Sequence, residues 1–174
     1  LRISQIGESS LSSLWRGYKV GAKLHETFFF EKYAFDQASM TASFSYSFDS
    51  ERTFTETVTF DASDAVIQED VLDRCLELAF FVVGTSYYKC FPTAKAEYRG
   101  KHFTKKQAEF INRVYRDGLS QFIFENHVDP TTMLQVEGRG KELEPHVYDG
   151  DGVLSLQSGG KDSLLLGELL NEKG

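Results

Sequence analysis

A short turn near residue 160 carries the residue types best suited to binding phosphate. It follows an apolar run, 153–156, and opens a second apolar run that suits a helix; its members are Ser158, Gly159, Gly160, Lys161, Asp162 and Ser163. Glycines let the backbone approach an anion closely, and the N–H groups at a helix start point at it. Lys161 adds a positive charge, and Ser158 and Ser163 add hydroxyl donors. The sequence therefore predicts a strand, a phosphate-binding turn and a helix.

The turn does not fit a Walker A loop, because that pattern requires Gly where Ser155 stands and Ser or Thr where Asp162 stands. It resembles instead the PP-loop of the ATP pyrophosphatase superfamily, Ser-Gly-Gly-x-Asp-Ser. All five fixed positions match: Ser158, Gly159, Gly160, Asp162 and Ser163. From the residues alone, a plain strand–turn–helix with glycine for tight packing stays an alternative.

The PP-loop resemblance implies a specific use of ATP. Enzymes of this superfamily cleave ATP between the α and β phosphates, adenylate a substrate oxygen and release pyrophosphate, with Mg²⁺ as the metal. On this resemblance Gly159, Gly160, Lys161 and Ser163 would hold the pyrophosphate portion, and Asp162 would position the magnesium or the loop. The cofactors expected from the sequence are therefore ATP and Mg²⁺.

The position of this turn predicts the domain organisation. One strand and one helix cannot bury a parallel sheet, which needs crossovers and cover on both faces. We therefore expect 152–174 to be the first βα unit of an incomplete α/β PP-loop domain. Before it, 129–151 is charged, aperiodic and rich in Gly and Pro, as linkers are. Residues 25–128 are expected to form an α+β domain, and 1–24 a polar N-terminal arm.

The first half of the α+β domain has the pattern of strands. Three runs, 25–36, 40–50 and 52–60, are rich in Phe, Tyr, Thr and Val, and aromatic residues alternate with serines in the second. Such alternation is typical of half-buried strands. With a turn at 49–52, these runs predict an antiparallel meander.

The second half has helical spacing. A first helix is expected from about Ala65, capped by Asp64 and ended by Gly84, and a second stretch over 104–127, broken at Gly118. The predicted apolar face of the first is Val71, Leu72, Cys75, Leu78, Ala79 and Val82; that of the second is Phe103, Phe110, Val114, Phe122 and Phe124. The predicted fold class is an antiparallel meander with helices, α+β.

Composition and charge exclude several functions. The net charge of −7 argues against a dedicated nucleic-acid binder, although the stretch from Lys89 to Arg116 has eight Lys or Arg against two Glu. Cys75 and Cys90 form no C-x-x-C pair, and the four histidines show no metal-ligand spacing. No apolar run reaches the length of a membrane span. We expect a cytoplasmic protein that binds neither nucleic acid nor membrane, with no metal-ligand cluster of its own.

Most of the chain resembles the N-terminal region of the bacterial UDP-N-acetylmuramoyl-L-alanyl-L-glutamate epimerases. The resemblance depends on "FFFEKYAFD" (28–36), "ASFSYSFD" (42–49), "VVGTSYYK" (82–89) and "YRDGLSQFIFENHVD" (115–129), followed by the "SGGKDS" turn. It implies ATP-dependent epimerisation of the terminal L-glutamate of the UDP-sugar dipeptide through an acyl-adenylate, in peptidoglycan precursor synthesis. The catalytic base is not identified from the sequence.

Five residues are candidates for contact with that substrate. Tyr87, Tyr88 and Lys89 place two rings beside a cation at a helix end, and Lys105 and Lys106 belong to the basic stretch that could meet the diphosphate. The alternatives are ring packing for the tyrosines and a solvated basic face for the lysines. Two other function classes stay open, namely another PP-loop ATP pyrophosphatase, tRNA-modifying or amide-forming, and a non-enzymatic binding domain.

Overall fold

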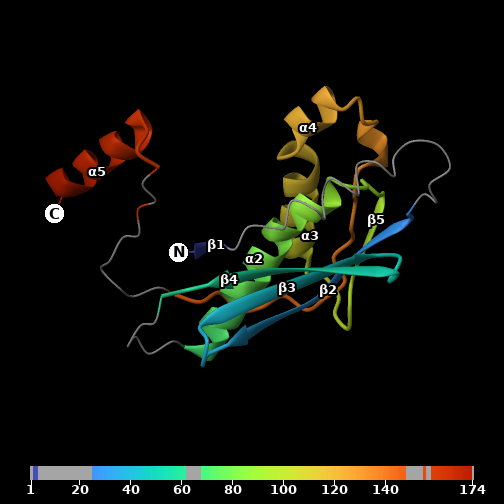
Figure 1. The fold of residues 1–174 in the computed structure, drawn as a ribbon, viewed down its shortest axis with the longest axis horizontal. Coiled ribbons are helices and arrows are strands. Elements are labelled where there is room, and N and C mark those ends of the chain that lie inside the picture. Colours follow the sequence, from blue (N-terminus) through green and yellow to red (C-terminus); the bar gives the residue numbers. More distant parts are fainter. Residues whose placement is uncertain (1, 4–24, 62–67, 148–154, 156–157, 174) are drawn as a thin grey trace. The chain divides into compact units, whose positions relative to one another are not determined.

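The computed structural model describes residues 2–3, 25–61, 68–147, 155 and 158–173, which fall into two units, Leu1–Leu143 and Glu144–Gly174. In the first unit, helices pack on a sheet with the strand order β1-β4-β3-β2-β5 (Figure 1). In the second unit the described residues form one helix, α5 (Lys161–Lys173). The α+β class predicted from the sequence is confirmed.

The sheet contains the predicted antiparallel meander. Its strands are β1 (Arg2–Ile3), β2 (Thr27–Asp36), β3 (Thr41–Phe48), β4 (Arg52–Thr59) and β5 (Lys95–Tyr98). β2, β3 and β4 are antiparallel, β1 pairs with β4, and β5 runs parallel to β2 at the other edge. The turn expected at 49–52 is present, because Asp49 and Ser50 have φ of 49° and 59°, as a tight hairpin turn requires.

Five helical segments follow the meander in the described part of the first unit. They are α2 (Glu69–Tyr88), α3 (Lys105–Asn112), α4 (Ser120–Glu125) and the short 3₁₀ turn η2 (Pro130–Thr132), with a π-helical turn, η1 (Arg113–Asp117), directly after α3. The break predicted at Gly118 is present, since η1 ends there. The predicted cap Asp64 lies outside the described residues.

The face of α2 that packs on the sheet differs from the predicted one. Its buried side chains are Leu76, Glu77, Phe80, Phe81, Tyr87 and Tyr88, whereas Leu78 and Val82 are 52% and 44% exposed and Cys75 is exposed. Two apolar stripes run along this helix, and the one with the larger rings is buried. An aromatic side chain removes more apolar surface from water than Leu, Val or Cys does. The predicted face is therefore wrong at Cys75, Leu78 and Val82, whereas its members Leu72 and Ala79 do pack against the core.

Gly84 was predicted to end the helix, but it lies inside α2. A Cβ atom at this position would meet Tyr115 Oη at 2.6 Å, a Tyr46 ring carbon at 3.0 Å and a Phe30 ring carbon at 3.1 Å. The Tyr46 and Tyr115 hydroxyls donate to the carbonyls of Phe80 and Phe81, one turn earlier in α2. Glycine is therefore required for close approach of three rings and has no role as a helix stop.

The predicted apolar face of residues 104–127 is wrong in part. Ala108, Ile111, Tyr115 and Ile123 are the buried residues of this region's helices, with Phe103 buried just before α3. Phe110 is 36% exposed and Phe124 is 81% exposed. The π turn adds a residue to one helical turn, which shifts the residues after it relative to a continuous α-helix.

An extended segment after η2 completes the core of the first unit. Met133, Leu134 and Val136 are buried, and the Leu134 N–H donates to Tyr88 Oη at 2.8 Å. The Asn112 side chain bonds both backbone groups of Val136, at 2.8 and 2.9 Å. The first part of the expected linker thus packs against α2 and α3.

Candidate functional site

The glycine turn lies directly before α5 and contains one left-handed backbone position. Gly159 has φ of +79°, which favours glycine, and a Cβ atom built at this position would meet nothing within 4 Å. α5 begins at Lys161, so the N–H groups of its first turn lack partners within the helix. The strand predicted at 153–156 lies outside the described residues, apart from Ser155, so the strand part of the PP-loop prediction stays a prediction.

The serine at the end of the turn holds the turn together. Ser163 is buried, and its hydroxyl donates to the Gly160 carbonyl at 2.8 Å, while the Leu164 N–H donates to the same oxygen at 3.1 Å. Lys161, Asp162 and Ser158 are exposed, so a lysine cation, a carboxylate and a second hydroxyl remain available at the helix start. These groups fit a phosphate, which prefers positive helix ends and charged donors.

Binding of Mg²⁺ at this turn would require the phosphates of a bound nucleotide as additional ligands. Within the described residues, no group of three or more His, Cys, Asp or Glu side chains could hold a metal ion. Asp162 is the acidic residue in the first turn of α5. Mg²⁺ is commonly bound by one or two carboxylates together with substrate phosphates, and a single carboxylate beside a phosphate-binding turn is compatible with that mode.

The two tyrosines predicted to contact substrate pack in the core of the first unit. Tyr88 is fully buried, and its hydroxyl donates to the Thr93 carbonyl at 2.8 Å. Tyr87 is 6% exposed and donates to Glu56 at 2.8 Å. Burial raises the pKa of Tyr88 to about 12 and that of Tyr87 further, so both phenols stay protonated at neutral pH. Lys89 follows α2 and is partly exposed.

Lys105 and Lys106 form the first two positions of α3 and are exposed. A capping box closes this helix start: the Thr104 hydroxyl accepts from Gln107 N, and the Gln107 side chain accepts from Thr104 N. The Lys106 N–H donates to Glu142 Oε1 at 3.0 Å. Two cations at the positive end of a helix oppose its dipole by about 0.3–1 kcal/mol each, so stability does not explain their presence.

A buried carboxylate on α2, which the sequence analysis did not single out, joins this helix to β5 and α3. Glu77 is 8% exposed; it accepts from Tyr98 at 2.7 Å, Gln107 at 2.6 Å and Lys101 at 3.3 Å. The Lys101 ammonium also donates to Tyr33 Oη at 3.3 Å. All of these groups satisfy one another, which is the pattern of a structural network that holds α2 to β5 and α3. A carboxylate inside the apolar run "LELAFF" was the signal for it.

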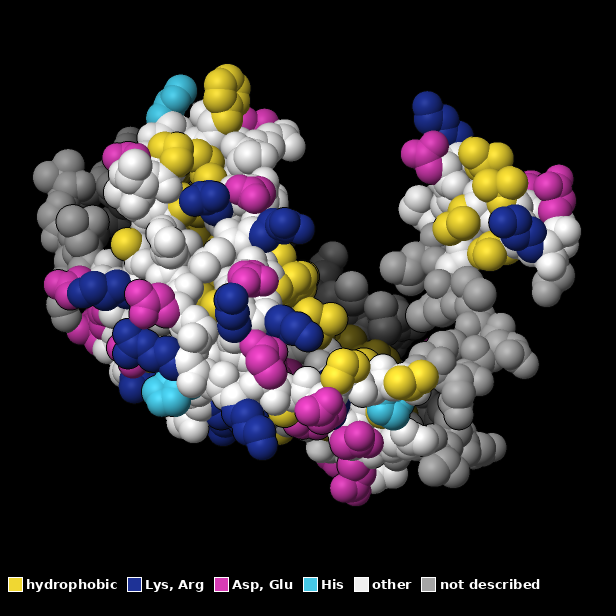
Figure 2. Space-filling model, turned by 180° about the vertical axis from the view of Figure 1, so that it is seen from behind, with side chains coloured by type: hydrophobic (Ala, Val, Ile, Leu, Met, Phe, Trp, Pro, Cys, Tyr) yellow, Lys and Arg dark blue, Asp and Glu magenta, His cyan; other side chains and the backbone are white. Residues whose placement is uncertain are grey.

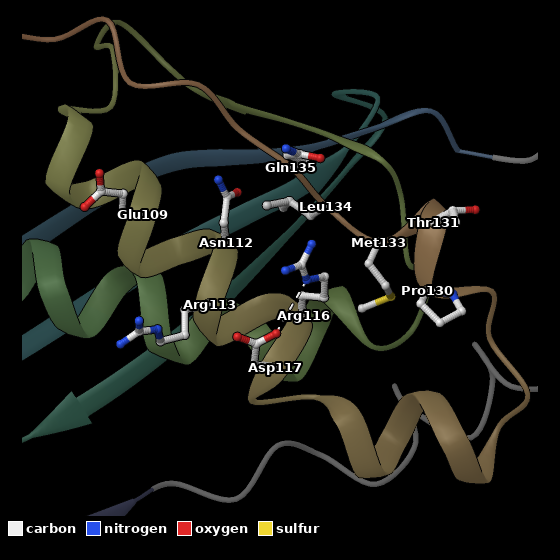
Figure 3. A pocket seen from close by; sticks show the side chains of 10 residues that line it. All are labelled: Glu109, Asn112, Arg113, Arg116, Asp117, Pro130, Thr131, Met133, Leu134 and Gln135. Atoms are coloured by element: carbon white, nitrogen blue, oxygen red, sulfur yellow. Dashed lines mark hydrogen bonds and ion pairs between the residues drawn. The ribbon is translucent and has the colours of Figure 1, made fainter.

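One pocket of the first unit lies beside η1. It has a volume of about 870 Å³ and is lined by Asn112, Arg116, Asp117, Thr131, Met133 and Leu134, among others. Figure 3 shows the Arg116 side chain extending towards Leu134, whereas the Arg113 side chain points away from the other labelled residues. A second pocket, of about 600 Å³, shares Arg116 with the first and is lined by Phe124 and His127.

Charged side chains are mixed on the face of the first unit seen in Figure 2. Lys and Arg alternate with Asp and Glu there and form no continuous basic patch. On the second unit, apolar side chains gather on one side of α5, and Leu164, Leu165, Leu166 and Leu169 are 44–61% exposed. Within the described residues, no helix has the length and apolar character needed to cross a membrane.

Comparison with known proteins gives one consistent family. The model of the MurL N-terminal domain family matches residues 20–174. The chain belongs to this family. A curated relative from Salinispora tropica is 30% identical over 158 residues, and one from a Micromonospora species is 31% identical over 160. Both are named UDP-N-acetyl-alpha-D-muramoyl-L-alanyl-L-glutamate epimerase.

The match covers most of this MurL N-terminal domain chain but a minor part of each relative. The aligned region is 86% of the chain, and 34% and 35% of the two relatives, so the chain spans about a third of their length. No solved structure gives a significant match. The resemblance to the epimerase family seen in the sequence is confirmed.

Proposed function

We propose that this chain is part of an enzyme that epimerises the terminal L-glutamate of UDP-N-acetylmuramoyl-L-alanyl-L-glutamate with ATP and Mg²⁺, through an acyl-adenylate. The observation that carries the proposal is a glycine turn with all five fixed PP-loop positions, at the start of a helix, in a chain of the MurL N-terminal domain family. The curated relatives carry the name of this epimerase activity.

The chemistry explains why an epimerase would need such a turn. The Cα proton of glutamate is poorly acidic because the neighbouring carboxylate is negative. Adenylation of that carboxylate removes its charge and makes it ester-like, so that a base can take the proton and an acid can return one on the other face. Adenylation itself releases the pyrophosphate, and hydrolysis of the epimerised adenylate then gives the D-glutamate product and AMP. Lys161 and the N–H groups at the start of α5 would bind the pyrophosphate portion.

The two units would have separate tasks. The glycine turn and α5 belong to the second unit, and the exposed leucines of α5 suit a helix that packs on further structure. The first unit would hold the sugar-nucleotide dipeptide, with cations of the Lys89–Arg116 stretch near its diphosphate. This division assigns ATP and substrate to different parts of the protein.

An assay of the protein expressed from its complete gene tests the proposal. Incubation with the L-glutamate substrate, ATP and Mg²⁺ is expected to give D-glutamate after acid hydrolysis, measured by chiral chromatography, together with AMP and pyrophosphate. ATP–pyrophosphate exchange that depends on this substrate separates the epimerase from other PP-loop enzymes. Exchange that depends on a different acceptor would replace the substrate assignment, and absence of exchange with every acceptor would leave only a binding role.

Charge reversal at the start of α3 gives a second prediction. Lys105→Glu with Lys106→Glu is expected to raise KM for the sugar nucleotide by roughly 10-fold at low ionic strength, because these exposed cations attract the diphosphate over a distance. KM for ATP should change less. At high salt the effect should shrink, because exposed charges are screened.

The matched control keeps the same change in net charge. Lys32→Glu with Arg52→Glu alters two exposed cations on the sheet, outside the basic stretch. Thermal denaturation is expected to show the α3 variant as stable as the parent or slightly more so, since acidic residues suit a helix start. Equal KM changes in both double variants would contradict a local role for Lys105 and Lys106.

A further inference from the structure

We infer that the hollow beside η1 and α4 is the subsite for the nucleoside diphosphate end of the substrate, with Arg116 contacting phosphate and Phe124 stacking on the base. We call it the Arg116 hollow and define it as the two adjoining pockets that share Arg116, Asp117 and Pro130. The inference rests on the proposed function for the identity of the nucleotide, and on the geometry for the site itself.

The Arg116 hollow has a suitable size and a fixed wall. Its two parts have volumes of about 870 and 600 Å³, and pockets for small molecules commonly measure about 300–1,000 Å³. The wall formed by Met133 and Leu134 is buried, and the Leu134 N–H is bound to Tyr88 Oη. A wall held by core hydrogen bonds is in place before a ligand arrives, which lowers the cost of binding.

The cations of the hollow are presented by the π turn. η1 (Arg113–Asp117) carries Arg113 and Arg116, and π turns are frequent at functional sites. Arg116 Nε lies 3.4 Å from Asp117 Oδ1, but both side chains are more than 60% exposed, so this pair contributes little stability. A diphosphate would offer Arg116 a stronger, bidentate partner.

An exposed aromatic ring also lines the hollow. Phe124 is 81% exposed, although its neighbour Ile123 is 9% exposed and packs in the core. Exposed aromatic rings commonly serve as stacking platforms for bases, and every base has a face that can stack. Together with Arg116, which lines the same pocket, Phe124 supplies the two contacts that a nucleotide requires.

The backbone at His127 supports a role for its ring. α4 ends in a Schellman motif, since the Val128 N–H donates to the Ile123 carbonyl at 3.0 Å and the His127 N–H to Phe124 at 3.3 Å. His127 occupies the left-handed position of this motif, with φ of 52°, where glycine is usual. His127 thus occupies a backbone conformation that favours glycine. Its ring lines the hollow together with Phe124, where it can contact the base or ribose.

The hydrophilic part of the lining favours a nucleotide over a protein partner, although Glu109 and Asp117 balance the charges of Arg113 and Arg116. A protein-binding face would be expected to surround its aromatic anchor with other apolar side chains. Here Arg116, Asp117, Ser120 and His127 line the same pocket as Phe124, together with the apolar Ile123, Val128 and Pro130. A ring with a cation and other hydrophilic groups beside apolar ones matches a base linked to phosphates.

Direct binding and kinetics in the protein expressed from its complete gene test the inference. UDP is titrated calorimetrically into the parent and into Arg116→Gln, Phe124→Ala and His127→Gly. Arg116→Gln and Phe124→Ala should each weaken UDP binding about 10-fold or more. His127→Gly should weaken it while thermal stability stays equal or rises, because glycine suits the left-handed backbone. Arg139→Gln, an exposed arginine outside the hollow, should leave UDP binding unchanged.

The kinetic arm uses two substrates. KM for the UDP-linked substrate should rise in the same variants, and KM for the muramoyl dipeptide without UDP should not. Epimerisation with unchanged UDP binding in all variants, or no UDP binding by the parent, overturns the inference and leaves the proposed function standing. UDP binding that depends on Arg116 and Phe124 without epimerisation supports the subsite and contradicts the proposed function. Lower melting temperatures with equal KM changes for both substrates would make this face a protein contact and overturn the subsite.

Discussion

Lys161→Ala and Asp162→Ala are each expected to lower the rate of pyrophosphate release by at least about 100-fold in the protein expressed from its complete gene. Lys161 is the cation at the start of α5. Loss of its positive charge removes an attraction to the pyrophosphate, on which negative charge increases as the bond to the α phosphate breaks. Asp162 is the one carboxylate in that helical turn and the candidate to position Mg²⁺. Pyrophosphate is measured by a coupled phosphate assay with the sugar-nucleotide substrate present.

The two variants should differ in stability although they agree in activity. Removing a cation from the positive end of a helix is stabilising, and removing an anion there is destabilising, each by about 0.3–1 kcal/mol. Lys173→Ala and Glu172→Ala, at the other end of the same helix, are the matched controls and should retain turnover. Normal ATP turnover in both loop variants would rule out the phosphate-binding role, and equal loss in the controls would point to damage of α5 itself.

The three strands of the meander were predictable because one physical pattern dominates them, whereas β1 and β5 were not predicted. Phe44, Tyr46 and Phe48 alternate along β3, all three are nearly fully buried, and no other element competes for the same stretch. The turn at Asp49 and Ser50 follows from residue types that tolerate left-handed backbone. Period and turn chemistry therefore agree locally, and the meander needs no tertiary information.

The helical faces were not predictable to the same degree, because α2 has two apolar stripes and only tertiary packing selects one. Gly84 shows the same limit, since its role depends on Tyr115 and Phe30, which are distant in sequence. Phe122 and Phe124 did carry a usable signal. Residues two apart lie on different sides of a helix, so only one of these two rings can face the core.

The candidate sites divide in a similar way. The glycine turn is local, and its residue types alone indicate phosphate. The Arg116 hollow is made by α3, η1, α4, η2 and the segment after η2, so its members are scattered over the sequence from Glu109 to Gln135. Lys105 and Lys106 were singled out from the basic stretch by sequence, but the arginine that extends into a pocket is Arg116 at the other end of that region.

Epimerisation in D₂O should place about one deuterium at the glutamate Cα of each product molecule, because the proposed chemistry removes one proton and returns another. ATP has to be present for this exchange, since without adenylation the carboxylate stays negative and the Cα proton stays poorly acidic. Mass spectrometry of the product, with proton NMR of the Cα signal, measures both the amount and the position of the label.

The substrate recovered from a partial reaction adds information that the product cannot give. If separate groups act on the two faces of Cα, the D-glutamate product carries deuterium while recovered L-glutamate does not. The described tyrosines of the core are poor candidates for the base, because burial raises the pKa of Tyr88 to about 12 and that of Tyr115 well above its usual value. Reactions without ATP, and with the Lys161→Ala variant, should leave both molecules unlabelled. A product formed at full rate without Cα deuterium would exclude proton exchange at this carbon, even if the glycine turn proved to bind ATP.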